Sequence, residues 1–260
     1  MTQFFSFDSV HIEYNGTPTL HNISFSLREG EILGIIGESG SGKSTIIKAI
    51  INILGNNARI TQGKICFNGT NLLELNQQKM RKICGPKIGM IFQDCRFALC
   101  PVRSIGSQIH DTFSAHTHTS RSESDRMALE LFQKFGFKDG KRILNSYPFE
   151  LSGGMIQRVG IAMAMLLNPS LILADEPTSA LDVSVQKQIL NEIGFVRNSY
   201  NTAVILVSHN IGVIKSLADS VMVLKNGHIV EYGATQDIFD NPQQNYTKEL
   251  IAAAPVLRRN

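Results

Sequence analysis

The sequence predicts an α/β protein with a phosphate-binding loop. Strand and helix patterns alternate through residues 153–218, which is typical of a parallel sheet covered by helices. A glycine-rich loop at residues 37–44 stands between an apolar run at 31–36 and a helical pattern at 43–54. Apolar and polar residues alternate before it, which indicates strands between residues 4 and 36.

The remaining elements are expected in order along the chain. Residues 65–67 end in Asn68-Gly69, a turn signal. Residues 96–150 are more polar and richer in histidine, and we expect a helical subdomain inserted there. Beyond it the pattern predicts helices at 153–167, 183–200 and 211–218, strands at 171–175 and 203–208, a hairpin of 221–224 and 228–231, and a final helix at 246–254.

Composition and charge exclude several classes of protein. The chain has 260 residues, 43% hydrophobic and 18% charged, which suits one sizeable globular domain. A net charge of +3 is too small to favour nucleic acid as a partner. The longest apolar run, residues 159–167, is far shorter than the roughly 20 residues of a membrane-spanning helix, and no secretory signal opens the chain. We therefore expect a cytoplasmic protein.

The four cysteines are expected to be reduced thiols that pack as small apolar side chains, because none forms a C-x-x-C pair. They are Cys66, Cys84, Cys95 and Cys100. A metal site between residues 95 and 118 is the alternative, although the polar sequence there favours a solvated loop. Its members would be Cys95, Cys100, His110, His116 and His118.

Residues 37–44 carry the clearest chemical signal. They match G-x-x-x-x-G-K-[ST] at every fixed position, and Thr45 follows. Glycines let such a loop curl so that backbone N–H groups face phosphates, and the helix that begins there adds its positive end. We expect Lys43 to reach the β- and γ-phosphates and Ser44 to hold Mg²⁺. The nucleotide-binding residues expected here are Gly37, Glu38, Ser39, Gly40, Ser41, Gly42, Lys43, Ser44 and Thr45.

The apolar strand pattern at residues 171–174 ends in two carboxylates. Ligands of α/β sheets bind at the carboxyl ends of the strands. We therefore expect Asp175 to bind Mg²⁺ and Glu176 to polarise the attacking water, whereas the segment by itself would suit a solvated acidic turn. The phosphate loop alone would leave kinases, small GTPases and many other ATPases open.

Residues 151–158 read LSGGMIQR and narrow the choice. The segment resembles the LSGGQ signature of the ATP-binding-cassette (ABC) family and precedes the acidic strand as it does there. A serine and glycine amides at a helix start suit a γ-phosphate, although Ser-Gly-Gly in isolation is more often a plain helix cap. The resemblance implies ATP as the nucleotide and assigns contacts with it to Ser152, Gly153, Gly154 and Gln157.

Four further positions resemble landmarks of this family, in its order. Tyr14 resembles the aromatic that stacks on adenine, and Gln93 the Q-loop glutamine that contacts Mg²⁺ and water and senses the membrane partner. Residues 179–182 resemble the D-loop, which communicates across a dimer and adds Asp182 to the ATP contacts. His209 resembles the H-loop histidine at the γ-phosphate. The resemblance thus implies Glu176, His209 and Gln93 as catalytic residues and Ser44, Gln93 and Asp175 as Mg²⁺ ligands.

The resemblance spans nearly the whole chain and implies its architecture. This is a P-loop NTPase core of the ABC ATPase type with an N-terminal antiparallel β subdomain and an inserted α-helical subdomain. We expect a single domain over residues 1–260. Its parts would be the core with the β subdomain at 1–94 and 159–234, the helical subdomain with the signature at 95–158, and a short helical tail at 235–260.

One phosphate loop and one signature imply a second cassette, since ATP in this family lies between the loop of one ATPase domain and the signature of another. We expect a paralogue as that partner, with a homodimer as the alternative. The resemblance also implies two transmembrane permease subunits, a substrate-binding protein that acts indirectly, and a place on the cytoplasmic face of the cell membrane.

Three local features resemble the peptide and nickel importers of bacteria. They are the loop wording GESGSGKS, the YPFE that leads into a signature with Met155, and a C-terminal motif of Asn241-Pro242, Tyr246-Thr247, Leu250 and Pro255. Phe149 and residues 155–158 lean toward the nickel type. We therefore expect the ATPase subunit of an importer for nickel or a metal chelate. A dipeptide or oligopeptide importer is the alternative, and an exporter or a soluble ABC ATPase of DNA repair or translation is less favoured.

The chain departs from this branch in three places. Residues 95–101, which face the membrane subunit in relatives, replace the usual PxxSLNP, so the docking partner is open. Asn210 follows His209 where Asp is usual, with little expected loss. No cysteine follows Cys100, so we expect no iron–sulfur cluster of the kind some peptide importers carry.

Overall fold

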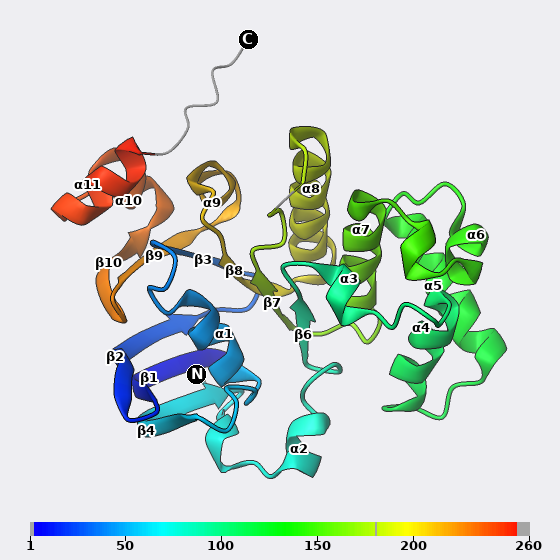
Figure 1. Ribbon diagram of the computed structural model, residues 1–260, viewed down its shortest axis with the longest axis horizontal. Helices are drawn as coiled ribbons and strands as arrows, with labels where there is room; N and C mark the ends of the chain where they lie inside the picture. Colours follow the sequence, from blue (N-terminus) through cyan, green and yellow to red (C-terminus); the bar gives the residue numbers. More distant parts are fainter. Residues whose placement is uncertain (1–2, 180, 254–260) are drawn as a thin grey trace. The chain divides into compact units, whose positions relative to one another are not determined.

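The computed structural model describes residues 3–179 and 181–253. These residues form two compact units. Unit 1 comprises residues 3–80 and 201–253, and unit 2 comprises residues 81–200 (Figure 1). Both contain strands and helices, so the expected α/β class is confirmed.

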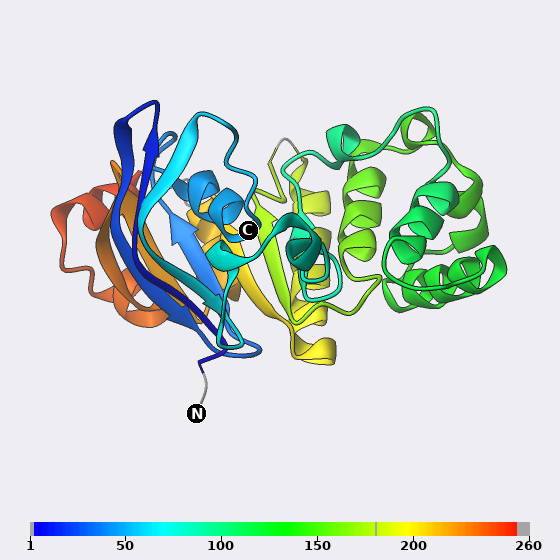
Figure 2. The ribbon, with the colours of Figure 1, turned by 90° about the horizontal axis from the view of Figure 1, so that it is seen from below.

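An antiparallel sheet opens unit 1, with the strand order β2-β1-β4-β5. Its strands are β1 (Phe5–Tyr14), β2 (Thr17–Leu27), β4 (Ala58–Phe67) and β5 (Thr70–Asn71). Figure 2 shows β1, β2 and β4 side by side in blue to cyan. Phe5 and Phe7 are almost fully buried, and so are Val10 and Ile12 beyond the register shift that follows Phe7, so the period-two burial changes phase at that irregularity.

The second sheet segment of unit 1 has the order β10-β9-β3-β8. Strand β3 (Ile32–Ile36) pairs in parallel with β8 (Ala203–Val207) and with β9 (Ser220–Lys225), and every residue of β3 is buried. Strand β10 (His228–Ala234) is antiparallel to β9. The hairpin turn expected at Asn226-Gly227 is confirmed, because both residues have positive φ, 46° and 75°, as a tight type I′ turn requires.

Helices and a short helical turn complete unit 1. They are α1 (Lys43–Ile50), η1 (Leu72–Glu74), α9 (Ile211–Leu217), α10 (Thr235–Asp240) and α11 (Asn245–Ala252). Helix α2 (Gln77–Arg81) runs to the limit of the unit. Helices α10 and α11 follow β10 and pack against it (Figure 1).

Unit 2 has two parallel strands, β6 (Ile88–Ile91) and β7 (Leu171–Asp175), and a group of helices. The helices are α3 (Cys95–Ala98), α4 (Ile105–Ser114), α5 (Arg121–Lys134), α6 (Gly140–Asn145), η2 (Pro148–Glu150), α7 (Gly153–Ala164) and α8 (Val183–Tyr200). Helices α4, α5 and α6 pack against one another, while α7 packs on α3, α8 and β6. Helical structure at 96–150 is thus confirmed, whereas the exact division into core, helical subdomain and tail stays a prediction.

The elements differ from the sequence expectations in several places: β4 begins at residue 58 where only 65–67 were expected, and β6 was not expected. Helix α1 ends at Ile50 rather than at residue 54. Asn52 adopts a left-handed backbone with φ of 56°, and its N–H donates to the carbonyl of Ala49, which stops the helical pattern. Helix α7 likewise ends at Ala164, and Asn168 downstream is also left-handed. Periodicity therefore located the helices but not the asparagines that end them.

All four cysteines are free thiols, but only Cys95 is buried as a small apolar side chain would be, and Cys100 is exposed. Burial raises the pKa of the Cys95 thiol to about 12. Within the described ranges, no group of three or more potential ligands among His, Cys, Asp and Glu lies in a metal-binding arrangement. The His110 ring lies between the hydroxyls of Ser124 and Ser114 instead, at 3.1 and 3.4 Å. No helix in the same part of the chain has the length and apolar character to cross a membrane.

One buried ion pair ties two helices of unit 2 together. Arg158 on α7 and Glu192 on α8 are each 7% exposed and hydrogen-bonded to one another. Arg158 also donates to the carbonyl of Phe135 at 2.6 Å and stacks on the Phe137 ring at 4.2 Å. Burial raises the pKa of Glu192 in spite of the neighbouring guanidinium.

We expect Glu192→Ala to destabilise the protein by about 3–5 kcal/mol, because it leaves the Arg158 charge buried without its partner. Urea unfolding followed by circular dichroism would measure the change. The matched control is Glu130→Ala on α5, whose partner is the exposed Arg126 and whose loss should cost less than about 1 kcal/mol. Equal losses in the two variants would contradict a special role of the buried pair.

Candidate functional site

The phosphate loop in unit 1 begins where the buried strand β3 ends. Lys43, the first residue of α1, is 6% exposed. Its Nζ donates to the carbonyl oxygens of Gly37 at 2.9 Å and Glu38 at 2.7 Å. The ammonium group thus holds the start of the loop in a curl above the helix.

Gly37 is required by a close approach of the backbone. A Cβ there would lie 2.1 Å from the carbonyl oxygen of Leu224, at the end of β9. Its φ of 153° is also in the region that favours glycine. The first glycine of the motif is therefore explained by packing against the neighbouring strand.

The loop and helix start fit a phosphate group. Helix α1 has no side-chain cap, and its first turn contains no acidic residue, so its N-terminal amides suit an anion. The Ser41 hydroxyl is buried and has no hydrogen-bond partner among the described residues. Ser44, half-buried in the first helical turn, offers the hard oxygen ligand that Mg²⁺ prefers.

Two other predicted residues lie in unit 1. Tyr14 is the half-buried last residue of β1 and pairs with Thr17 and Ala58. His209 is exposed just after β8. Asn210 caps helix α9 by accepting the N–H of Val213, and asparagine is as good a cap as aspartate. The departure at this position therefore retains the local structure.

In unit 2 the structure brings two predicted catalytic residues together. The Gln93 amide donates to the Glu176 carboxylate at 3.3 Å. Asp175 ends strand β7, and Glu176 directly after it has a φ of 46°. Among the described residues, seven of the nine non-glycine positions with positive φ are asparagine, which tolerates that backbone, and Glu176 is the only glutamate. Such strain is typical of functional positions.

The signature segment begins helix α7. Ser152 is its N-cap, and the hydroxyl accepts the N–H of Met155 at 3.3 Å. A Cβ at Gly153 would meet open space, whereas one at Gly154 would lie 2.7 Å from Val185 on α8. Ser152 thus does cap helix α7. Ser152 and Gly153 are nevertheless exposed, so a ligand can approach them.

The side chain of Gln157 is buried and hydrogen-bonded to the backbone on either side of Gln93. It is 3% exposed, its Oε1 accepts the N–H of Cys95 at 3.1 Å, and its Nε2 donates to the carbonyl of Phe92 at 2.9 Å. Both ends of the amide therefore hold the loop that carries Gln93. These bonds give Gln157 a role in holding the Q-loop, and its expected ATP contact stays a prediction.

Asp182 stabilises the start of α8. It accepts hydrogen bonds from the Ser184 hydroxyl at 2.6 Å and the Val185 N–H at 2.9 Å, and these contacts lower its pKa. Its expected ATP contact stays a prediction. Residue 180 of the expected D-loop lies outside the described residues, as does Pro255 of the C-terminal motif.

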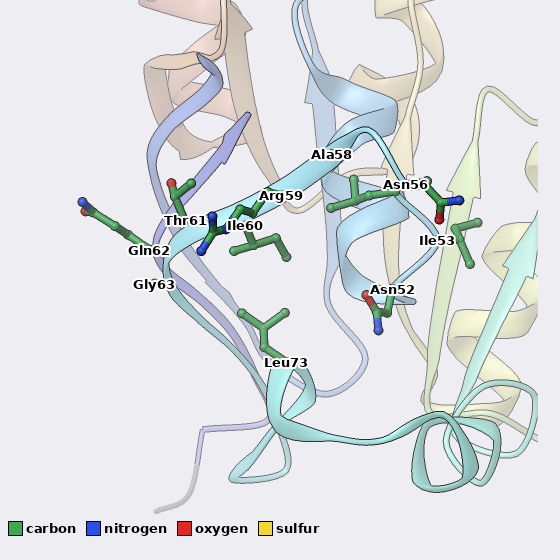
Figure 3. A pocket seen from close by; sticks show the side chains of 12 residues that line it. Asn52, Ile53, Asn56, Ala58, Arg59, Ile60, Thr61, Gln62, Gly63 and Leu73 are labelled. Carbon is green, nitrogen blue, oxygen red and sulfur yellow. The ribbon is translucent and has the colours of Figure 1, made fainter. Parts of the chain in front are cut away.

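A cavity of about 730 Å³ lies elsewhere in unit 1. It is lined by β4 and by the loop after α1, including Asn52, Arg59 and Gln62 (Figure 3). None of the predicted site residues lines it.

Sequence reasoning missed one contact of the phosphate loop. The Tyr246 hydroxyl accepts the Glu38 N–H at 3.2 Å. The only sequence signal for this contact was that Tyr246 belongs to the C-terminal motif. The motif by itself does not indicate which residue the tyrosine contacts.

Comparison with known proteins shows the family. Residues 20–179 match the family described as ABC transporter. The chain is 41% identical over 99% of its length to the probable peptide ABC transporter ATP-binding protein y4tR of Sinorhizobium fredii, of which it covers 76%. It is 40% identical over 95% of its length to the dipeptide transport ATP-binding protein DppD of Lactococcus lactis, covering 71% of that protein. The metal-staphylopine import system ATP-binding protein CntD of Staphylococcus aureus is 40% identical over 90% of this chain and 86% of its own.

Solved structures agree with this assignment. The ATP-binding cassette MJ0796, determined as a dimer in a post-hydrolysis state with ADP and Pi, matches with a TM-score of 0.77 and 29% identity. The match covers 89% of this chain and 98% of that one.

We expect Gln157→Leu to lower the rate of ATP hydrolysis about ten- to a hundred-fold, because it releases the loop that positions Gln93. The dissociation constant for ATP should stay within about two-fold, since both ends of the side-chain amide are bonded to the Q-loop backbone. Titration with a fluorescent ATP analogue and a phosphate-release assay would separate the two effects. Gln133→Leu, at an exposed position on α5, is the control, and weaker ATP binding with an unchanged rate would refute the positioning role.

Proposed function

The chain belongs to the ABC transporter family, and from this premise we propose that it is the ATPase subunit of an importer for dipeptides or oligopeptides. It is an ATPase whose hydrolysis is coupled to transport. The single observation that carries the cargo class is about 40% identity, over 95% of the chain or more, to ATP-binding proteins named for peptide and dipeptide transport.

A metal chelate is the second candidate. The similarity to the metal-staphylopine system, at 40% identity over 90% of the chain, favours it. The nickel leaning has less support, because none of the three named relatives is named for nickel. The residues behind the nickel expectation also differ in their surroundings, since the Phe149 side chain is exposed and the Ile156 side chain on α7 is buried at 2% exposure.

In unit 1, the phosphate loop would bind the nucleotide. Its amides and the Lys43 ammonium would neutralise the β- and γ-phosphates, and Tyr14 would stack on the adenine. His209 would contact the γ-phosphate from its exposed position after β8.

In unit 2, Glu176 would polarise the attacking water. The Gln93 amide, hydrogen-bonded to that carboxylate, would orient it. Mg²⁺, when bound, supplies charge neutralisation at the phosphates, and Ser44, Gln93 and Asp175 are the oxygen ligands we propose for it.

A second cassette would complete the active enzyme. The exposed Ser152 and Gly153 would face the γ-phosphate bound to that partner, which we take to be a paralogue, with a homodimer as the alternative. Two permease subunits would receive the resulting motion at the cytoplasmic face of the membrane, and the substrate-binding protein would act through them.

Exposed apolar side chains around α3 support the permease contact. Phe97 is 90% exposed, Val102 78% and Phe92 41%, and all three lie within ten residues of Gln93. Such clustered apolar exposure is typical of a protein interface. The segment that departs from the family wording thus retains the character of a docking surface.

We expect Glu176→Gln to bind ATP and to abolish turnover, because the amide cannot accept a proton from water. In cells that lack the native gene, this variant should fail to restore uptake of a radiolabelled dipeptide, whereas Glu130→Gln should restore it. Undiminished hydrolysis in Glu176→Gln would remove its catalytic role. Restored dipeptide uptake, with loss of chelated-metal uptake, would favour the second candidate. If neither cargo depended on the variant, the importer proposal would fail.

We expect Phe97→Asp to weaken binding to the permease about ten-fold or more, the effect of losing an aromatic anchor. Hydrolysis by the isolated subunit should not change. Co-purification with the permease and dipeptide uptake would measure the effect, and Phe97→Leu, which stays apolar, is the control. Normal uptake in Phe97→Asp would exclude this surface as the docking site.

A further inference from the structure

The C-terminal motif reaches the phosphate loop, and we propose that Tyr246 is a positioning residue for ATP binding. Its hydroxyl would keep the peptide that opens the loop in the orientation that ATP requires. This inference rests on the proposed role of residues 37–44 as the phosphate site.

The peptide between Gly37 and Glu38 is tied at both ends. Its carbonyl oxygen accepts a hydrogen bond from Lys43 Nζ at 2.9 Å, and its N–H donates to Tyr246 Oη at 3.2 Å. A peptide held on both sides cannot rotate without breaking one of these bonds. Because Lys43 is the residue that meets the phosphates, the hydroxyl of Tyr246 also sets the position of that ammonium group.

The Tyr246 ring is itself held in place. It is 8% exposed, and Lys225 Nζ lies 4.2 Å from its centroid in a cation–π contact. Lys225 follows Leu224, whose carbonyl oxygen would meet a Cβ at Gly37. The end of β9 thus touches both the start of the loop and the residue that restrains it.

The helix that carries Tyr246 is anchored to β10. The Glu231 carboxylate accepts the N–H groups of Gln243 at 2.8 Å and Gln244 at 3.2 Å, directly before α11 begins. Thr247, next to Tyr246, is fully buried. The C-terminal motif therefore connects strand β10 to the phosphate loop through hydrogen bonds at both places.

The restraint does not change near neutral pH. Burial raises the pKa of Tyr246, so its hydroxyl stays protonated. It therefore accepts the Glu38 N–H as a neutral phenol.

The test is Tyr246→Phe in the full chain, which removes one oxygen and keeps the ring. We expect the dissociation constant for ATP to rise about five-fold, the effect of one lost hydrogen bond, while kcat at saturating ATP stays within about two-fold. Tyr232→Phe is the matched control, because that hydroxyl donates to the Ser26 carbonyl at 3.3 Å and does not reach the loop. Its ATP affinity should equal that of the wild type.

A second variant tests the hydrogen bonds between Glu231 on β10 and the residues before α11. Glu231→Gln keeps the size of the side chain but removes the charge that accepts two N–H groups, and we expect ATP affinity to fall about two- to five-fold. Thermal unfolding without nucleotide would be measured for each variant. Wild-type ATP affinity in Tyr246→Phe, or a loss of kcat alone, would overturn the proposal. An unmodified protein that binds no ATP would instead refute the proposed function.

Discussion

The contact of the Lys43 ammonium with the carbonyl oxygens of Gly37 and Glu38 is the interaction on which the nucleotide site of unit 1 depends. Strand β3, buried along its whole length between β8 and β9, delivers Gly37 to the place where this contact can form. The buried sheet thus provides the rigid support, and one charged side chain shapes the flexible part above it. Catalytic positions on rigid elements hold their geometry better than positions on free loops.

In each unit, a buried side chain outside a proposed functional loop is hydrogen-bonded to the backbone of that loop. In unit 2, the buried amide of Gln157 holds the backbone on either side of Gln93 and so acts through another residue. In unit 1, Tyr246 holds the first peptide of the phosphate loop. In each case the supporting residue belongs to a motif that sequence reasoning had associated with ATP or with the branch of the family. The structure assigns these motif positions to support of the loops.

The proposed cargo class rests on similarity along the chain and not on single residues. Phe149 is 72% exposed and the Ile156 side chain on α7 is 2% exposed, so the two residues do not form one surface. Similarity over nearly the whole chain therefore supports the peptide class better than these two positions support nickel. Exposed apolar residues around α3 are the surface that we propose a permease covers.

Short-range patterns in the sequence determined the α/β class, the phosphate loop, the acidic pair after β7 and the signature, because each depends on residues that are neighbours along the chain. They placed β3, β7 and β8 well but missed most of β4 and all of β6. The helix ends were also misplaced, since the asparagines at 52 and 168 leave the helical backbone without a change in apolar periodicity. Only the tertiary structure decided the roles of Gln157 and Tyr246. Their partners lie 62 and 208 residues away in the chain, and no local pattern specifies a hydrogen bond across that distance.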